Sequence, residues 1–165
     1  MRIRIAVITL ALLICLSNLL LGDAKVDIQE DPVRDYITAV RAELSKGKAG
    51  LINKIMKFSV KEAKIFWPIY YEYEQELFEL GDRRLEMIER FVVAHNDKAL
   101  DDALAKTMAV DWFRLQTDRL ELFKKYHNVI TKELSAVRAA QFVQIEHRAN
   151  TVIDIMIASE LPLIK

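Results

Sequence analysis

The sequence predicts an all-α protein, in which four helices form a long antiparallel hooked hairpin or bundle behind a cleaved signal peptide. Three observations support this fold class. The chain of 165 residues holds only four glycines and three prolines, too few turn residues for a fold of many strands. Apolar residues recur at three- and four-residue spacings along most of it. No Gly/Ser-rich linker interrupts residues 25–165, so we expect a single domain there.

Residues 1–24 are expected to be the signal peptide. Arg2 and Arg4 form a basic start, and residues 5–22 carry no charge and are almost wholly apolar. Small residues, Gly22 and Ala24, then stand where a signal peptidase reads them, so cleavage is expected after Ala24. The alternative is a retained N-terminal membrane anchor, because the uncharged run approaches the length that spans a bilayer.

Charge and cysteine content narrow the possible functions. The 24 basic and 24 acidic residues balance, and the predicted cleavage leaves a net charge of −1. A nucleic-acid-binding surface needs a clear basic excess, so no nucleic-acid partner is expected. The one cysteine, Cys15, lies in the signal segment, so the exported chain must fold by packing alone, without a disulfide.

The first helix is expected over about residues 32–57. Asp31 and Pro32 supply an N-cap and a first-turn proline. Gly47 and Gly50 weaken the middle, but the apolar pattern resumes after them, which favours one bent helix. Its apolar face begins with Val33, Ile37, Val40 and Leu44.

The second helix is expected from Ser59 to about Val93. Ser59 and Glu62 form a capping box, in which each side chain accepts a hydrogen bond from a backbone N–H. Pro68 lies inside this helix and should bend its axis. Its buried seam is predicted to be Phe66, Tyr70, Tyr73, Leu77 and Leu80.

Two further helices complete the predicted fold, over about residues 98–132 and from Ser135 to a point before Pro162. Short connections make consecutive helices antiparallel neighbours. The third helix should bury Leu104, Met108, Trp112, Leu115, Arg119, Leu122, Tyr126 and Val129, and the fourth Phe142, Ile145, Ala149, Val152 and Met156.

A second apolar arc on the second helix is the most informative feature for function. It consists of Trp67, Tyr71, Phe78 and Leu85, roughly 100–140° around the helix from Phe66. Two apolar arcs indicate two packing partners. The second partner is either another helix of the same chain, or a second subunit or an unfolded polypeptide; the latter makes these four residues a candidate client-binding or dimer surface.

Catalytic and metal sites are not expected. His95, His127 and His147 lie far apart, and none has a second histidine at the helical spacing that metal pairs use. The sequence contains no Gly-rich phosphate loop and no nucleophile motif. Acidic residues on amphipathic helices usually form the solvated face. We therefore expect no enzyme, no catalytic residue, no metal and no cofactor.

An apolar–hydroxyl–x–x–polar signature opens two of the predicted helices, and it resembles the periplasmic family named for its Leu-Thr-x-x-Gln motif, which includes Spy and CpxP. The resemblance covers about residues 40–165 and indicates a divergent proteobacterial branch. Its two copies are Phe58-Ser59-Val60-Lys61-Glu62 and Leu134-Ser135-Ala136-Val137-Arg138, supported by Phe66-Trp67-Pro68-Ile69-Tyr70 with Tyr73, and by Gln144-Ile145-Glu146. Serine replaces threonine in both copies, which preserves capping. Arg138 cannot accept the reciprocal hydrogen bond, so the second box is only half present.

The resemblance implies a periplasmic, ATP-independent chaperone-like protein that forms a homodimer and binds unfolded or partly folded envelope proteins. It also allows an alternative, a regulatory binding module of an envelope stress or metal-sensing system, whose partner is an envelope sensor protein. Neither function implies a cofactor or, after cleavage, stable insertion into the membrane. The basic concave surface that is typical of the family receives only partial support from this near-neutral chain.

Overall fold

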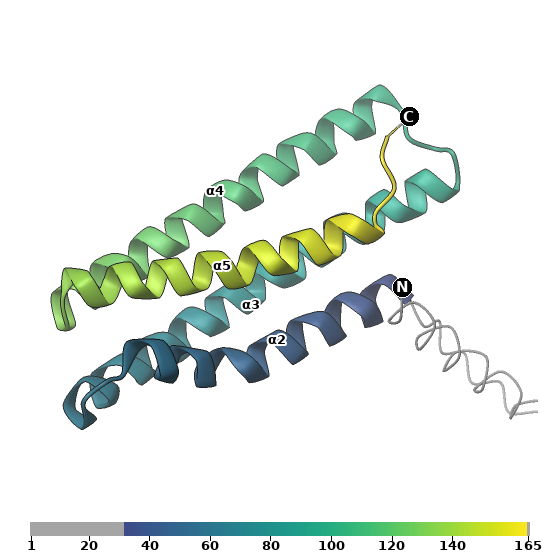
Figure 1. Ribbon diagram of the computed structural model, residues 1–165. Coiled ribbons are helices and arrows are strands. Elements are labelled where there is room, and N and C mark those ends of the chain that lie inside the picture. Colours follow the sequence, from purple (N-terminus) through teal and green to yellow (C-terminus); the bar gives the residue numbers. More distant parts are fainter. Residues whose placement is uncertain (1–31, 165) are drawn as a thin grey trace, which may run out of the picture. The chain divides into compact units, whose positions relative to one another are not determined.

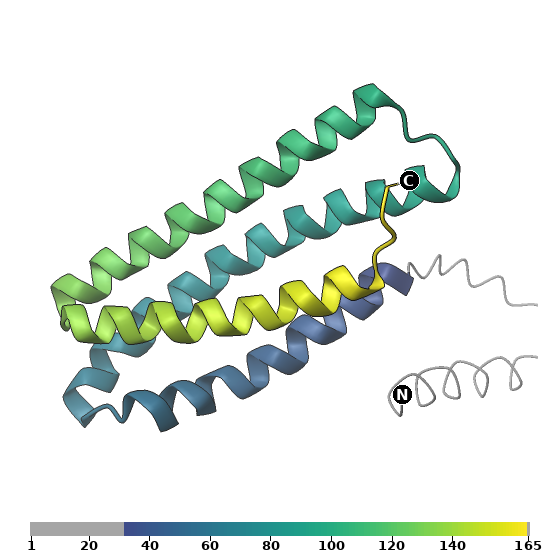
Figure 2. The same ribbon diagram turned by 45° about the horizontal axis from the view of Figure 1, so that its top comes forward.

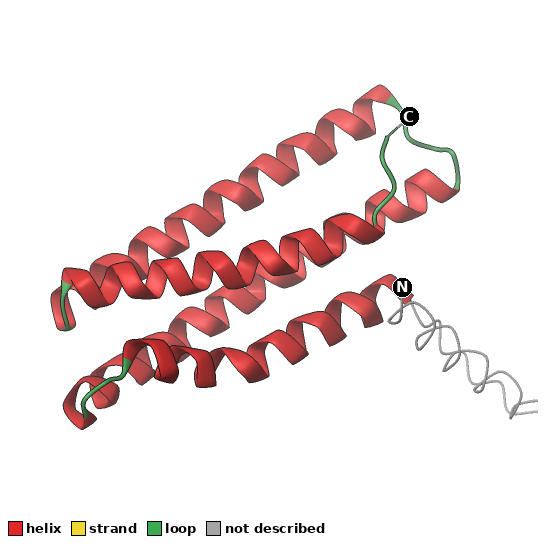
Figure 3. Ribbon diagram, viewed as in Figure 1, coloured by secondary structure: helices red, strands yellow, loops and turns green. Residues whose placement is uncertain are grey.

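The computed structural model describes residues 32–164, except for the side chains of Pro32, Val33 and Leu44. These residues form four α-helices: α2 (Pro32–Met56), α3 (Val60–Asn96), α4 (Asp102–Glu133) and α5 (Ala136–Glu160) (Figure 1). No strand occurs among the residues described (Figure 3). The predicted all-α class and the four predicted helices are confirmed. The predicted signal peptide, residues 1–24, and the predicted N-cap Asp31 lie outside the described residues.

The helices alternate in direction, and each packs against two others. Helix α3 contacts α4, α4 contacts α5, and α2 contacts both α5 and α3 (Figures 1 and 2). The pairing of α2 with α5 joins the first and last of these helices and closes the set around a common interior. Within residues 32–164, no helix is both long enough and apolar enough to cross a bilayer.

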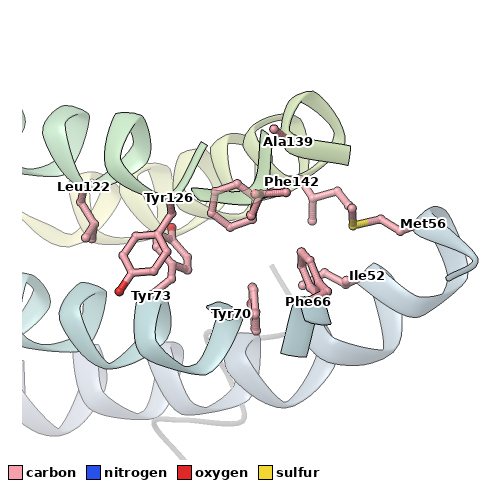
Figure 4. Close-up of a cluster of buried hydrophobic side chains, with 11 residues drawn as sticks. Ile52, Met56, Phe66, Tyr70, Tyr73, Leu122, Tyr126, Ala139 and Phe142 are labelled. Atoms are coloured by element: carbon pink, nitrogen blue, oxygen red, sulfur yellow. The ribbon is translucent and has the colours of Figure 1, made fainter. Parts of the chain in front are cut away.

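Buried side chains form two separate clusters along the interior. The larger, which we call the aromatic core, contains Ile52, Met56, Phe66, Tyr70, Tyr73, Leu122, Tyr126, Ile130, Ala139, Phe142 and Ile145. In Figure 4 its rings converge from α3, α4 and α5, with Met56 of α2 beside them. The smaller, the aliphatic core, contains Ile37, Leu85, Ile88 and Ile157. Burial of apolar side chains is the main stabilising contribution to such a fold.

The predicted seam of α3 is confirmed at Phe66, Tyr70 and Tyr73, which are fully buried, while Leu77 and Leu80 are half-buried against the aromatic core. The periodicity of three and four residues predicts the buried face of this helix well because α3 has neighbours on both sides.

The predicted stripes of α4 and α5 are each wrong at one position. Trp112 is 48% exposed and Val152 is also exposed. Helices α4 and α5 lie close together near the connection between them and separate toward their other ends (Figures 1 and 2). On α5 the buried face runs through Asn150 and Ile157 instead, and Val152 lies on a different side of the helix.

Both predicted hydroxyl caps are present. The Ser59 hydroxyl accepts a hydrogen bond from the Glu62 N–H, and the Ser59 N–H donates to the Glu62 carboxylate at 2.8 Å, which completes the capping box. The Ser135 hydroxyl accepts from the Arg138 N–H at 3.2 Å. Arg138 makes no reciprocal bond to the cap, as its lack of an acceptor predicts.

The Arg138 side chain instead connects three helix ends. Its Nε donates to the Glu62 carboxylate at 2.8 Å, and one amino group donates to the carbonyl of Met56, the last residue of α2. The guanidinium also lies 5.3 Å from the ring centroid of Phe58. The two copies of the motif are therefore joined side chain to side chain.

This contact predicts an acid-sensitive stability. The hydrogen bond from Arg138, together with those from Ser59, lowers the pKa of Glu62 from 4.5 to about 2. A carboxylate with a lowered pKa stabilises the fold above the unfolded value, and this contribution is lost as pH falls from 4.5 toward 2. Thermal melts followed by circular dichroism should show the melting temperature falling more steeply with acidification in the wild type than in Glu62→Gln. Parallel curves for the two proteins would contradict this expectation.

Candidate functional site

The interior of the bundle contains a buried carboxylate, Glu146 of α5, whose side chain is 0% exposed. It accepts hydrogen bonds from Lys48 Nζ at 3.0 Å, from the Tyr70 hydroxyl at 3.0 Å and from the Tyr73 hydroxyl at 2.9 Å. Lys48 Nζ also lies 3.1 Å from the carboxylate of Glu74. We call these five residues the Glu146 network.

Transfer of an isolated charge into a protein interior is strongly unfavourable, and burial is tolerated where the charge is paired and hydrogen-bonded. Glu146 satisfies both conditions, because an ammonium and two phenols converge on it. Burial and the charge of Glu146 raise the pKa of Tyr70 and of Tyr73 well above the usual value, so both hydroxyls remain protonated donors across the physiological range.

No sequence pattern indicates this network. Acidic residues of the amphipathic helices were predicted to lie on the solvated face, and for Glu146 that prediction is wrong. The spacing along α5 could have indicated that Glu146 is buried. Glu146 follows the buried Phe142 by four residues and precedes the buried Asn150 by four, so all three lie on one face of the helix.

Beside the network lies an elongated cavity of about 600 Å³, lined by residues from all four helices. Apolar side chains make up much of its wall, among them Leu77, Leu115 and Ile153. Lys48, Glu74 and Asn150 also line it, so the Glu146 network is in contact with the cavity. This volume falls within the range of small-molecule sites between helices.

A second charge cluster, also in contact with the cavity, is centred on Asp154 of α5. Its carboxylate accepts hydrogen bonds from Arg84 of α3 and from Arg119 of α4, the latter at 2.9 Å. Arg119 also donates to the side-chain oxygen of Gln116 at 2.6 Å. Both arginines line the cavity, so two guanidinium groups there share one carboxylate. Arg119, predicted as the charged member of the α4 stripe, is indeed half-buried.

The four residues of the predicted second arc have different environments. Tyr71 is 61% exposed and Phe78 is 59% exposed. Trp67 is half-buried against the aromatic core and stacks on Tyr71, with ring centroids 5.8 Å apart. Leu85 is only 3% exposed, within the aliphatic core, so its assignment to a client-binding or dimer surface is wrong. The physical reason is that Ile37 of α2 and Ile157 of α5 cluster with Leu85.

The Arg41 guanidinium packs against Phe78 and its neighbours on α3. The Arg41 guanidinium lies 4.3 Å from the Phe78 ring centroid and donates to the Phe78 carbonyl and to the Asp82 carboxylate, each at 2.8 Å. Gly81 makes room for it, since a Cβ there would lie 2.5 Å from an Arg41 amino nitrogen. Phe78 is therefore 59% exposed, with the Arg41 guanidinium lying over its ring.

The described residues contain no arrangement of side chains suited to a metal ion. Between residues 32 and 164, no group of three His, Cys, Asp or Glu side chains is placed to hold a metal ion. Of the three histidines, His127 contacts the side chain of Asn128 at 3.3 Å, and His95 packs near Phe91.

Comparisons of the chain with protein-family models, with curated proteins and with solved structures gave no match. The resemblance to the Leu-Thr-x-x-Gln family therefore rests on the residues of the two helix starts and the short stretches named with them.

Proposed function

We propose that the chain is an exported, periplasmic binding protein that holds unfolded or partly folded envelope proteins without using nucleotide, as a homodimer. The observation that carries this proposal is the exposure of two large aromatic side chains, Tyr71 and Phe78, on a helix whose seam of Phe66, Tyr70 and Tyr73 is buried. The resemblance of the two helix starts to the Leu-Thr-x-x-Gln family, with its Spy-type chaperones, agrees with it.

In the proposed mechanism, the aromatic rings contact apolar segments of a client, while charged neighbours keep the association fast and loose. Aromatic side chains contribute a large contact area at a small entropic cost. Glu72, Glu79 and Asp82 are exposed on the same helix, and charges of this kind steer encounters without adding much affinity.

Aggregation of a reduced client such as α-lactalbumin, followed by light scattering, tests the proposal. The mature chain, residues 25–165, should suppress aggregation at a stoichiometric ratio. The double variant Tyr71→Ser/Phe78→Ser should lose most of this activity, because the rings that contact the client are gone.

The matched control is Phe113→Ser, which removes a 62% exposed aromatic from α4 rather than α3 and should leave suppression unchanged. Absence of suppression by the wild type would overturn the proposal. If the wild type instead captures one specific envelope sensor and shows no general activity toward clients, the regulatory module is the better description.

A further inference from the structure

The cavity is long and narrow. On α2 its lining runs from Arg34 to Lys48, and on α3 from Glu74 to Ile88, each a span of about 21 Å of helix axis. Its volume is about 600 Å³. A lining that follows the helix axes over this length suits an extended chain-like molecule.

The cavity opens along the seam between α2 and α3. Its lining includes Thr38, Ala42 and Ser45 of α2 and Asp82 of α3, all of which are exposed. Deeper in the wall lie buried or half-buried apolar side chains, including Ile153 and the aliphatic core. A ligand can therefore enter from the side of the bundle and bury an apolar body against the interior.

The charges on the wall favour an anion at one place. Arg84 and Arg119 share the single carboxylate of Asp154, which leaves a local excess of one positive charge. Lys48, by contrast, lies between Glu74 and Glu146, so its positive charge is outweighed by two carboxylates and attracts no further anion.

Both guanidinium groups also carry N–H donors that the hydrogen bonds described above do not use. Among the residues described, the side-chain bonds of Arg84 use one amino group, Nη1, and those of Arg119 use both amino groups but not Nε. A guanidinium carries five N–H donors in a planar fork that suits carboxylate and phosphate oxygens. Both side chains are about three-quarters buried and face the cavity, where a charge-assisted bond is stronger than in water.

From this geometry we infer that the cavity between the two cores is a binding site for a small amphipathic organic anion, with one anionic head on Arg84 and Arg119 and an extended apolar body along the interior walls of α2 and α3. This site is separate from the client surface proposed above, although Phe78 borders both.

Isothermal titration calorimetry of the mature chain with dodecanoate, below its micellar concentration, tests the inference. Dodecyltrimethylammonium is the matched probe, because it has the same tail and the opposite head charge. We expect one dodecanoate per chain and at least a tenfold weaker affinity for the cation. Equal affinities for the two heads, or several weak sites per chain, would overturn the inference.

Two substitutions at the charge cluster separate a direct role from a structural one. Arg119→Gln should weaken dodecanoate binding about tenfold, because it removes a positive charge at the head site. Asp154→Asn removes the competing carboxylate and should tighten binding. General damage to the fold would weaken binding in both variants, so a loss in both contradicts the proposed head site.

Two further variants locate the bound tail. Ala42→Trp places an indole in the mouth of the cavity and should abolish binding, whereas Ala39→Trp, on the same helix but outside the lining, should not. Tyr71→Ser should leave dodecanoate binding unchanged, so failure of the client proposal and failure of this one can be distinguished. Binding that survives Ala42→Trp would place dodecanoate elsewhere and overturn the inference.

Discussion

Replacement of Lys48 by methionine should lower the free energy of unfolding by about 3–5 kcal/mol, the usual cost of removing one partner from a buried ion pair. Among residues 32–164, Lys48 is the only cationic partner of Glu146. Without it, the fully buried carboxylate keeps only the hydroxyls of Tyr70 and Tyr73 as hydrogen-bond donors. Urea unfolding followed by circular dichroism measures this loss.

The two partners of the pair should respond unequally. Glu146→Gln should cost less than Lys48→Met, because the amide oxygen still accepts a hydrogen bond from a tyrosine and Lys48 keeps Glu74 as its counter-charge. Lys48→Met/Glu146→Leu should recover much of the loss, since apolar replacement of a whole buried pair is often neutral.

The control for this series is Lys46→Met, two residues away on the same helix. Lys46 is exposed and lies 3.8 Å from Glu43, so its loss should change stability by no more than about 0.5 kcal/mol. A Lys48→Met variant as stable as Lys46→Met would show that the Glu146 network contributes nothing to stability.

Phe142→Ala should also cost about 3–5 kcal/mol, through a cavity in the aromatic core. The Phe142 ring stands edge-on to Tyr73, with centroids 4.9 Å apart and an interplanar angle of 84°, and edge-on to Tyr70 at 6.5 Å. Its removal deprives both tyrosines of a packing partner at the point where they reach Glu146. Phe142→Leu keeps most of the volume and should cost less than about 1.5 kcal/mol.

The matched control is Phe113→Ala, which makes the same chemical change on the exposed face of α4. It should change the free energy of unfolding by no more than about 0.5 kcal/mol. Equal losses at Phe142 and Phe113 would contradict the assignment of Phe142 to the core.

The positions of the helices could be predicted because their signals are local. Ser59 and Ser135 mark helix starts by capping chemistry, and apolar spacing marks the lengths between them. The seam Phe66, Tyr70 and Tyr73 was predictable because three large rings on one face of a helix have few alternatives to burial.

The content of the interior was harder to predict because it depends on how each helix is rotated and on which helices meet. Leu85 is buried because α2 and α5 both reach it, a contact that no local pattern encodes. Glu146 becomes favourable inside only when a lysine of α2 and two tyrosines of α3 point at the same place. The cavity likewise forms only where all four helices meet, so the spacing of residues along any one helix does not predict it.

The pairing of α2 with α5 has a consequence for synthesis. Lys48 and Glu146 are 98 residues apart, and the chain is made from its N-terminus, so the lysine is produced long before its buried partner. Until α5 is made, α2 lacks the helix against which it packs most of its buried face, and the ammonium has only Glu74 as counter-charge. The ring of helices therefore cannot close before the last helix is available.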